Sequence, residues 1–183
     1  MNSTKKTARI AGVLYLVNGV TGFFGIIYVP GRLIVSGNAT ATANNILASE
    51  RFFRLGIASE LICAVEFVFL FWILYRLLGG VSKTHASLMV ILGLVFVPIM
   101  VVNTLSEIGA LMLLYSADFL SVFDKRQLAT MAMLFLDLHR YGYVVAGFLA
   151  SSTSTSGYLC LDQVPPPHPG RLADRRMLRL LGR

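Results

Sequence analysis

The chain has 183 residues, of which 56% are hydrophobic and 14% charged, and its formal net charge is +7. Soluble domains carry about 25% charged residues, and one core in a protein of this size does not bury so much apolar surface. The composition therefore argues against an ordinary soluble domain and predicts a membrane protein.

Four long apolar stretches organise the chain, at residues 10–29, 55–78, 86–115 and 128–150. At a rise of about 1.5 Å per residue, each would form a helix of about 30 Å or more, which matches the hydrocarbon core of a bilayer. We therefore expect an all-α, polytopic membrane protein with four transmembrane helices and the lipid bilayer as its principal partner. A homo-oligomer or another membrane protein is a further possible partner.

The first stretch follows a short basic arm and ends at Pro30-Gly31, a pair that commonly ends helices. At about 20 residues it exceeds the apolar core of a signal peptide, about 7–15 residues, so we expect an uncleaved first span. Three glycines thin one side of it and would let a neighbouring helix approach closely. They are Gly19, Gly22 and Gly25.

Residues 30–54 form the first predicted loop, within which we expect a short interfacial helix with Thr42 as its N-cap. The second span follows. The third stretch has 30 residues and would measure about 45 Å as one straight helix, which is too long for the bilayer core. Pro98 lies within it, so we expect a kinked or tilted helix, with a re-entrant pair as the alternative. A polar loop at residues 116–127 then leads into the fourth span.

Basic residues indicate the orientation. Ten of the 16 Lys and Arg lie in the N-terminal arm, in the loop after the second span and in the C-terminal tail, whereas five lie in the opposite loops. The positive-inside rule then predicts a cytoplasmic N-terminus and a cytoplasmic C-terminal tail in a multi-pass protein of the plasma membrane. The same distribution argues against a nucleic-acid partner.

Composition changes abruptly at Ser151, which divides the chain into a transmembrane helical domain, residues 1–150, and a tail, residues 151–183. The tail combines a Ser/Thr run, three consecutive prolines and an Arg-rich end. One interpretation is a disordered, basic cytoplasmic tail. The other is a non-native, frameshifted sequence. When Ser, Thr and Pro codons are read one base late, the new codons include those for Leu, so the shifted frame can encode an apolar segment.

Several motifs resemble one known family. They are ARIAGVLYL at residues 8–16, TANNI at 42–46, RLGI at 54–57 with EL at 60–61, LYRLL at 74–78, LDLH at 136–139 and YGY at 141–143. Together they resemble the bacterial membrane family called domain of unknown function 4386, from residue 8 to about residue 150. The resemblance implies a multi-span protein of the inner membrane and brings no activity. The family pattern continues with further apolar helices where this chain departs at Ser151, which favours a frameshifted or truncated, and then non-functional, member.

A charged side chain inside an apolar stretch indicates a structural or functional role, because each costs about 2.5–3.5 kcal/mol at mid-bilayer on insertion scales. In the second span, Glu60 and Glu66 lie about 120° apart around the helix and do not form one carboxylate pair. In the third stretch, Asn103, Glu107 and Ala110 form a polar, small-residue face. In the fourth stretch, we expect an ion pair between Asp137 and Arg140 at i, i+3, whereas His139 points in another direction. The candidate intramembrane polar cluster comprises Glu60, Asn103, Glu107, Asp137, His139 and Arg140.

Two roles are open for this cluster: lining an interior cavity, as in proton relays and solute pathways, or hydrogen-bonding the helices together. The first hypothesis for function is a non-enzymatic protein that handles a small solute or ion, or a membrane scaffold. The alternative is an intramembrane enzyme with Asp137, His139 and Glu60 as acid–base groups. No catalytic residue, cofactor or metal site is predicted. A metal site is not expected because His85 lies in a loop and His168 in the tail, which leaves His139 without a histidine partner.

Overall fold

A computed structural model describes residues 2–115 and 120–162, and these residues form helices and no strand. The helices, in chain order, are α1 (Asn2–Gly22), the π-helical η1 (Phe23–Tyr28), α2 (Val29–Leu33), α3 (Ala39–Ala48), α4 (Glu50–Leu78), α5 (Lys83–Leu114) and α6 (Lys125–Asp162). The prediction of an all-α protein is therefore confirmed over the described residues.

Within residues 2–115 and 120–162, three segments are long and apolar enough to cross a membrane: Lys5–Leu33, Glu50–Leu78 and Lys83–Leu114. They correspond to the first three predicted spans. The fourth predicted span lies within α6, which is not among the three and remains a prediction. Large apolar side chains such as Leu16 and Phe148 are 70% and 75% exposed, as expected of surfaces that face lipid rather than water.

The first span differs from the prediction at its end, because the helix continues past Pro30 to Leu33. Proline has no N–H and crowds the carbonyl four residues before it, so a helix that includes one must adjust locally. The π-helical turn of residues 23–28 directly precedes Pro30, and in it the N–H of Val29 bonds to the carbonyl of Phe24. This wider turn accommodates the proline without ending the helix.

Two further local predictions need correction. Helix α5 runs without interruption from Lys83 to Leu114 through Pro98, so the re-entrant alternative is wrong. A short helix does precede α4, but its N-cap is Asn38, whose side chain accepts from the N–H of Ala41 at 2.9 Å. The Thr42 hydroxyl instead bonds the backbone of Val35. The interfacial position of α3 remains a prediction.

The structure also differs from the prediction at Ser151, since α6 continues for twelve residues to Asp162. The Ser/Thr hydroxyls in this part bond back to carbonyls of the preceding turn: Ser151 donates to Phe148 and Thr155 donates to Ser151. Such bonds satisfy hydroxyl groups inside a helix without any outside partner. The rest of the predicted tail, residues 163–183, lies outside the described residues.

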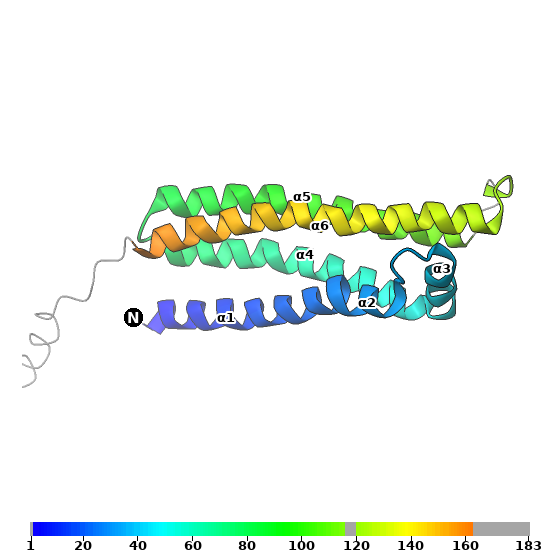
Figure 1. Ribbon diagram of the computed structural model, residues 1–183. Coiled ribbons are helices and arrows are strands. Elements are labelled where there is room, and N and C mark those ends of the chain that lie inside the picture. Colours follow the sequence, from blue (N-terminus) through cyan, green and yellow to red (C-terminus); the bar gives the residue numbers. More distant parts are fainter. Residues whose placement is uncertain (1, 116–119, 163–183) are drawn as a thin grey trace, which may run out of the picture.

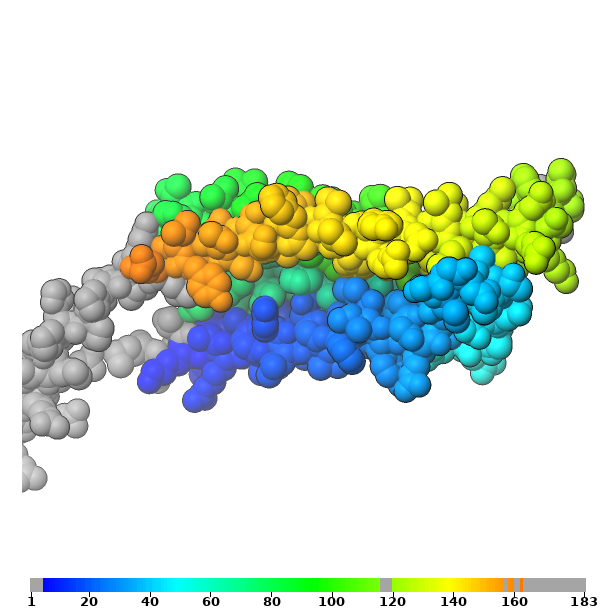
Figure 2. Space-filling view, viewed as in Figure 1, coloured from blue at the N-terminus to red at the C-terminus, as the bar shows by residue number. Residues whose placement is uncertain are grey.

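The long helices run side by side along one axis (Figure 1). α1 packs against α4, α4 against α5, and α5 against α6, while α3 packs against α6 at the end opposite the N-terminus. The N-terminus and the C-terminal end of α6 lie at the same end of the bundle. In Figure 2 a groove separates α1, in blue, from the last part of α6, in orange, and α4 is visible in its floor.

Candidate intramembrane site

Three buried ionisable side chains from three helices meet inside the bundle. Glu60 of α4, Glu107 of α5 and His139 of α6 are 0%, 2% and 5% exposed. The His139 Nε2 atom lies 3.3 Å from Glu60 Oε1 and 3.6 Å from Glu107 Oε1. One ligand atom from each residue lies within 4.8 Å of the other two. We call these three residues the EEH site.

Asn103 holds the imidazole of the EEH site in place. The Nδ1 atom of His139 lies 3.2 Å from the backbone oxygen of Asn103, and the side-chain Nδ2 of Asn103 donates to the backbone oxygen of His139 at 2.9 Å. A carbonyl oxygen only accepts, so Nδ1 carries the proton in this bond. The neutral ring then presents the lone pair of Nε2 toward the two carboxylates.

Tyr143 and Thr104 hold one oxygen of Glu60. The Tyr143 phenol donates to Glu60 Oε2 at 3.0 Å, and the Thr104 hydroxyl donates to the same oxygen at 3.2 Å. The Tyr143 ring also meets the His139 ring edge to face, with centroids 4.9 Å apart. These contacts fix the orientation of Glu60 and direct its other oxygen, Oε1, toward His139.

Two glycines allow the helices to approach at this level. A Cβ atom on Gly25 would lie 2.7 Å from Glu60 Cγ, and one on Gly142 would lie 1.9 Å from Asn103 Oδ1. Both distances are shorter than the contacts that real Cβ atoms make. Any larger residue at Gly25 or Gly142 would therefore displace a neighbour of the site. The prediction that Gly25 permits close helix packing agrees with this geometry, whereas Gly19 faces open space.

Three atoms of the EEH site have no hydrogen-bond partner in the described part of the chain. They are Glu60 Oε1, Glu107 Oε2 and His139 Nε2. Buried polar atoms in folded proteins are nearly always paired, and a buried charge without compensation is expensive. Two of these three atoms, Glu60 Oε1 and His139 Nε2, lie 3.3 Å apart, which is the distance of an ion pair with a protonated imidazole and also of two ligands on one bound cation.

The six predicted cluster residues separate into two groups. Glu60, Asn103, Glu107 and His139 come together, as described. Asp137 and Arg140 instead pair with each other at 3.0 Å on the outer side of α6, where their side chains are 38% and 60% exposed. No carboxylate other than Glu60 and Glu107 joins the EEH site among the described residues.

Sequence reasoning missed two features of the site. Thr104 was not singled out, although it lies three residues before Glu107 and so on the same face of its helix. The expectation of no metal site counted histidines alone. Glu60 and Glu107 can act as metal ligands in place of further histidines. Together with His139 they form a set able to hold a metal ion.

A pocket of about 330 Å³ lies beside the EEH site, whose atoms Glu60 Oε1, Glu107 Oε2 and His139 Nε2 are themselves buried. His139 and Tyr143 form part of its wall, together with Asp137 and Arg140. The other lining residues come from the end of the first span, from the loop that follows it and from α6. They are Ile26, Ile27, Pro30, Gly31, Ile34, Ser36 and Leu136.

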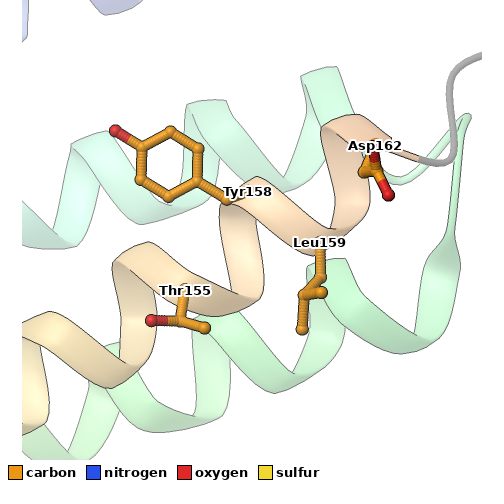
Figure 3. Close-up of a pocket in the computed structure, with 4 residues that line it drawn as sticks. All are labelled: Thr155, Tyr158, Leu159 and Asp162. Carbon is orange, nitrogen blue, oxygen red and sulfur yellow. The ribbon is translucent and has the colours of Figure 1, made fainter.

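A second pocket, of about 520 Å³, lies at the C-terminal end of α6 (Figure 3). Its four lining residues, Thr155, Tyr158, Leu159 and Asp162, all come from that single helix. Among the described residues this pocket contains no group of converging metal ligands. It therefore adds nothing to the site.

Comparison with known proteins identifies the family. No curated protein and no solved structure matches the chain. A family model described as Domain of unknown function (DUF4386) matches residues 10–168, which includes every residue of the EEH site and also the helical segment after Ser151. The prediction from the sequence motifs is confirmed, and the chain belongs to the DUF4386 family.

Proposed function

We propose that this protein is an integral membrane protein that binds a metal cation at the EEH site and so belongs to the ion-handling class. The observation that carries the proposal is the convergence of Glu60, Glu107 and His139, with three buried atoms that make no hydrogen bond. Two ionised carboxylates in a low-dielectric interior repel each other and lose their hydration. A cation between them offsets both costs.

A purely structural role fits other polar contacts better than it fits the EEH site. Asn18 Nδ2 donates to the Cys63 carbonyl at 3.0 Å, and Thr21 donates to Glu66 at 2.8 Å, so each pair joins the first span to α4. These contacts are complete in themselves, as expected of hydrogen bonds that hold helices together. The EEH site differs because its inward-facing atoms are left without a hydrogen-bond partner.

The membrane location and orientation are part of the proposal. Three apolar spans and extensive exposed apolar surface support insertion in the plasma membrane. The shared position of the N-terminus and the C-terminal end of α6 supports an even number of crossings, with both on one side of the membrane. The basic N-terminal arm supports the same orientation.

An intramembrane enzyme is the second candidate, and the pocket beside His139 and Tyr143 favours it because a substrate bound there would lie next to both side chains. His139 and Glu60 are then the acid–base groups. Asp137 is not in contact with them and lines the pocket wall instead. Its part in such chemistry is limited to binding a substrate.

Thermal unfolding in lipid nanodiscs tests the cation proposal. The untagged protein is stripped with a chelator and unfolded with and without sodium, potassium, magnesium, calcium, manganese or zinc chloride. A ligand at 100 times its Kd stabilises the folded state by about 2.7 kcal/mol. We expect at least one cation to raise the Tm of the wild type and of the control Glu66→Gln equally.

The variant Glu107→Gln, which is nearly isosteric, should lose that increase. Glu66 is a suitable control because it lies on α4 as Glu60 does, but bonds to Thr21 away from the site. If no cation raises the Tm of the wild type more than that of Glu107→Gln, the EEH site is structural and the proposal is wrong.

A further inference from the structure

We propose that the cation is a divalent transition metal of the zinc type, held by Glu60, Glu107 and His139 with a fourth, exchangeable position. This inference rests on the proposed function and names the chemical class of its ligand. Four features of the site support it: the distances between the ligand atoms, the tautomer of the imidazole, the formal charge of the ligands and the adjoining pocket.

The distances match tetrahedral coordination. Zinc binds imidazole and carboxylate at about 2.0–2.2 Å, so two ligands of a tetrahedral site lie about 3.3–3.6 Å apart. His139 Nε2 lies 3.3 Å from Glu60 Oε1 and 3.6 Å from Glu107 Oε1. Octahedral magnesium, with bonds of about 2.0–2.1 Å at right angles, would bring neighbouring ligands to about 2.9 Å. The two distances from His139 Nε2 therefore fit tetrahedral zinc better than octahedral magnesium.

The groups around the ligands have the arrangement found around protein-bound zinc. A metal-bound histidine usually donates its other ring N–H to a carbonyl or carboxylate, which fixes the tautomer, and a ligating carboxylate is itself hydrogen-bonded. Here the Asn103 carbonyl lies 3.2 Å from His139 Nδ1, and Tyr143 and Thr104 donate to Glu60 Oε2. Nε2 of His139 and Oε1 of Glu60 are thereby left for a metal.

Charge and ligand type favour a divalent transition metal. Two ionised carboxylates and a neutral imidazole carry a formal charge of −2, which one divalent cation cancels and one monovalent cation does not. Imidazole suits zinc, iron, nickel and copper, whereas magnesium and calcium prefer oxygen ligands alone. Because one of the three ligand atoms is an imidazole nitrogen, sodium, magnesium and calcium are poorer partners than zinc.

We assign the fourth position to the side of the site that adjoins a pocket. Zinc sites with three protein ligands hold water or substrate in the fourth position, whereas structural sites use four protein ligands. The described residues supply three. His139 and Tyr143 also line the pocket of about 330 Å³, so the pocket adjoins the site on its α6 side. The metal would therefore carry an exchangeable ligand from that side.

The test uses the untagged full-length chain in nanodiscs, stripped with a chelator and then dialysed against a small excess of zinc. Metal content is measured by mass spectrometry, and zinc affinity by competition with a chromophoric chelator. We expect one zinc per chain in the wild type and in Glu66→Gln, and background content in Glu107→Gln and His139→Gln. Equal zinc binding in Glu107→Gln would place the metal elsewhere and overturn the inference.

Cobalt substitution keeps the test independent of how the variants fold. Wild-type protein loaded with Co²⁺ should show the intense visible absorption bands of tetrahedral coordination, whereas weak octahedral bands would overturn the inference. If zinc does not bind while sodium or calcium raises the Tm through Glu107, the inference fails and the proposed function stands. If no metal binds, both fail.

Discussion

Replacing Gly142 with alanine should loosen the contact between α5 and α6 beside the EEH site. The new Cβ would lie 1.9 Å from Oδ1 and 2.5 Å from Cγ of Asn103, so the Asn103 side chain must move. Movement breaks its 2.9 Å bond to the His139 carbonyl. The same bond helps to hold the backbone segment that positions the imidazole.

The magnitude follows from three contributions. Overpacking a tight contact costs about 1–3 kcal/mol, and a hydrogen bond between membrane helices contributes about 0.6 kcal/mol on average. The higher helix propensity of alanine offsets about 1 kcal/mol of this. We therefore expect Gly142→Ala to lower the free energy of unfolding by about 0.6–2.6 kcal/mol.

Gly147 supplies the matched control, because it lies on the same helix and a Cβ there would meet nothing within 4 Å. Gly147→Ala should leave stability unchanged or raise it by up to about 1 kcal/mol. Reversible unfolding by sodium dodecyl sulfate in bicelles, followed by circular dichroism, measures both variants. Equal stability of the two would refute the tight α5–α6 contact at Asn103.

Three further predictions address the site, the topology and the tail. Tyr143→Phe removes the phenol that donates to Glu60 Oε2 but keeps the ring against His139, so zinc affinity should fall about 10- to 100-fold; unchanged affinity would show that the phenol does not orient Glu60. In a background lacking Cys63 and Cys160, Gly80→Cys should react with an impermeant maleimide from the cytoplasmic side only, and Asp124→Cys from the opposite side only; the reverse pattern would invert the topology. Sequencing the gene across the codons for residues 150–157 tests the predicted frameshift, which an uninterrupted frame that encodes the polar tail in the expressed protein would refute.

The sequence predicts the helices and the polar residues for the same physical reason. A long apolar segment is stable in lipid only as a helix, and a charged residue inside it is costly enough to be noticed. Glu60, Glu107 and His139 were therefore identifiable as unusual residues. Their convergence was not, because it depends on which faces of α4, α5 and α6 pack together. Glu66 carries the same charge on the same helix, yet bonds to Thr21 of the first span instead.

Local errors have local causes. Thr42 has good N-cap chemistry, but Asn38 starts the helix four residues earlier, and the Thr42 hydroxyl bonds the preceding loop. Pro30 normally marks a helix end, but a π-helical turn before it lets the helix continue. Propensity rules describe single positions. In both places the chain forms other hydrogen bonds, which these rules do not take into account.

The paired hydrogen bonds between Asn103 and His139 bear on how the protein could move. They run in opposite directions between α5 and α6, the helix pair with the most extensive packing. Sliding of α6 along α5 would break both at once, so these two helices form a stationary half that carries Glu107 and His139. Glu60 comes from α4 and is tied to the same pair by the hydrogen bonds that Thr104 of α5 and Tyr143 of α6 donate to it. Displacement of α4 would break these two bonds as well, so the polar contacts at this level oppose relative movement of all three helices.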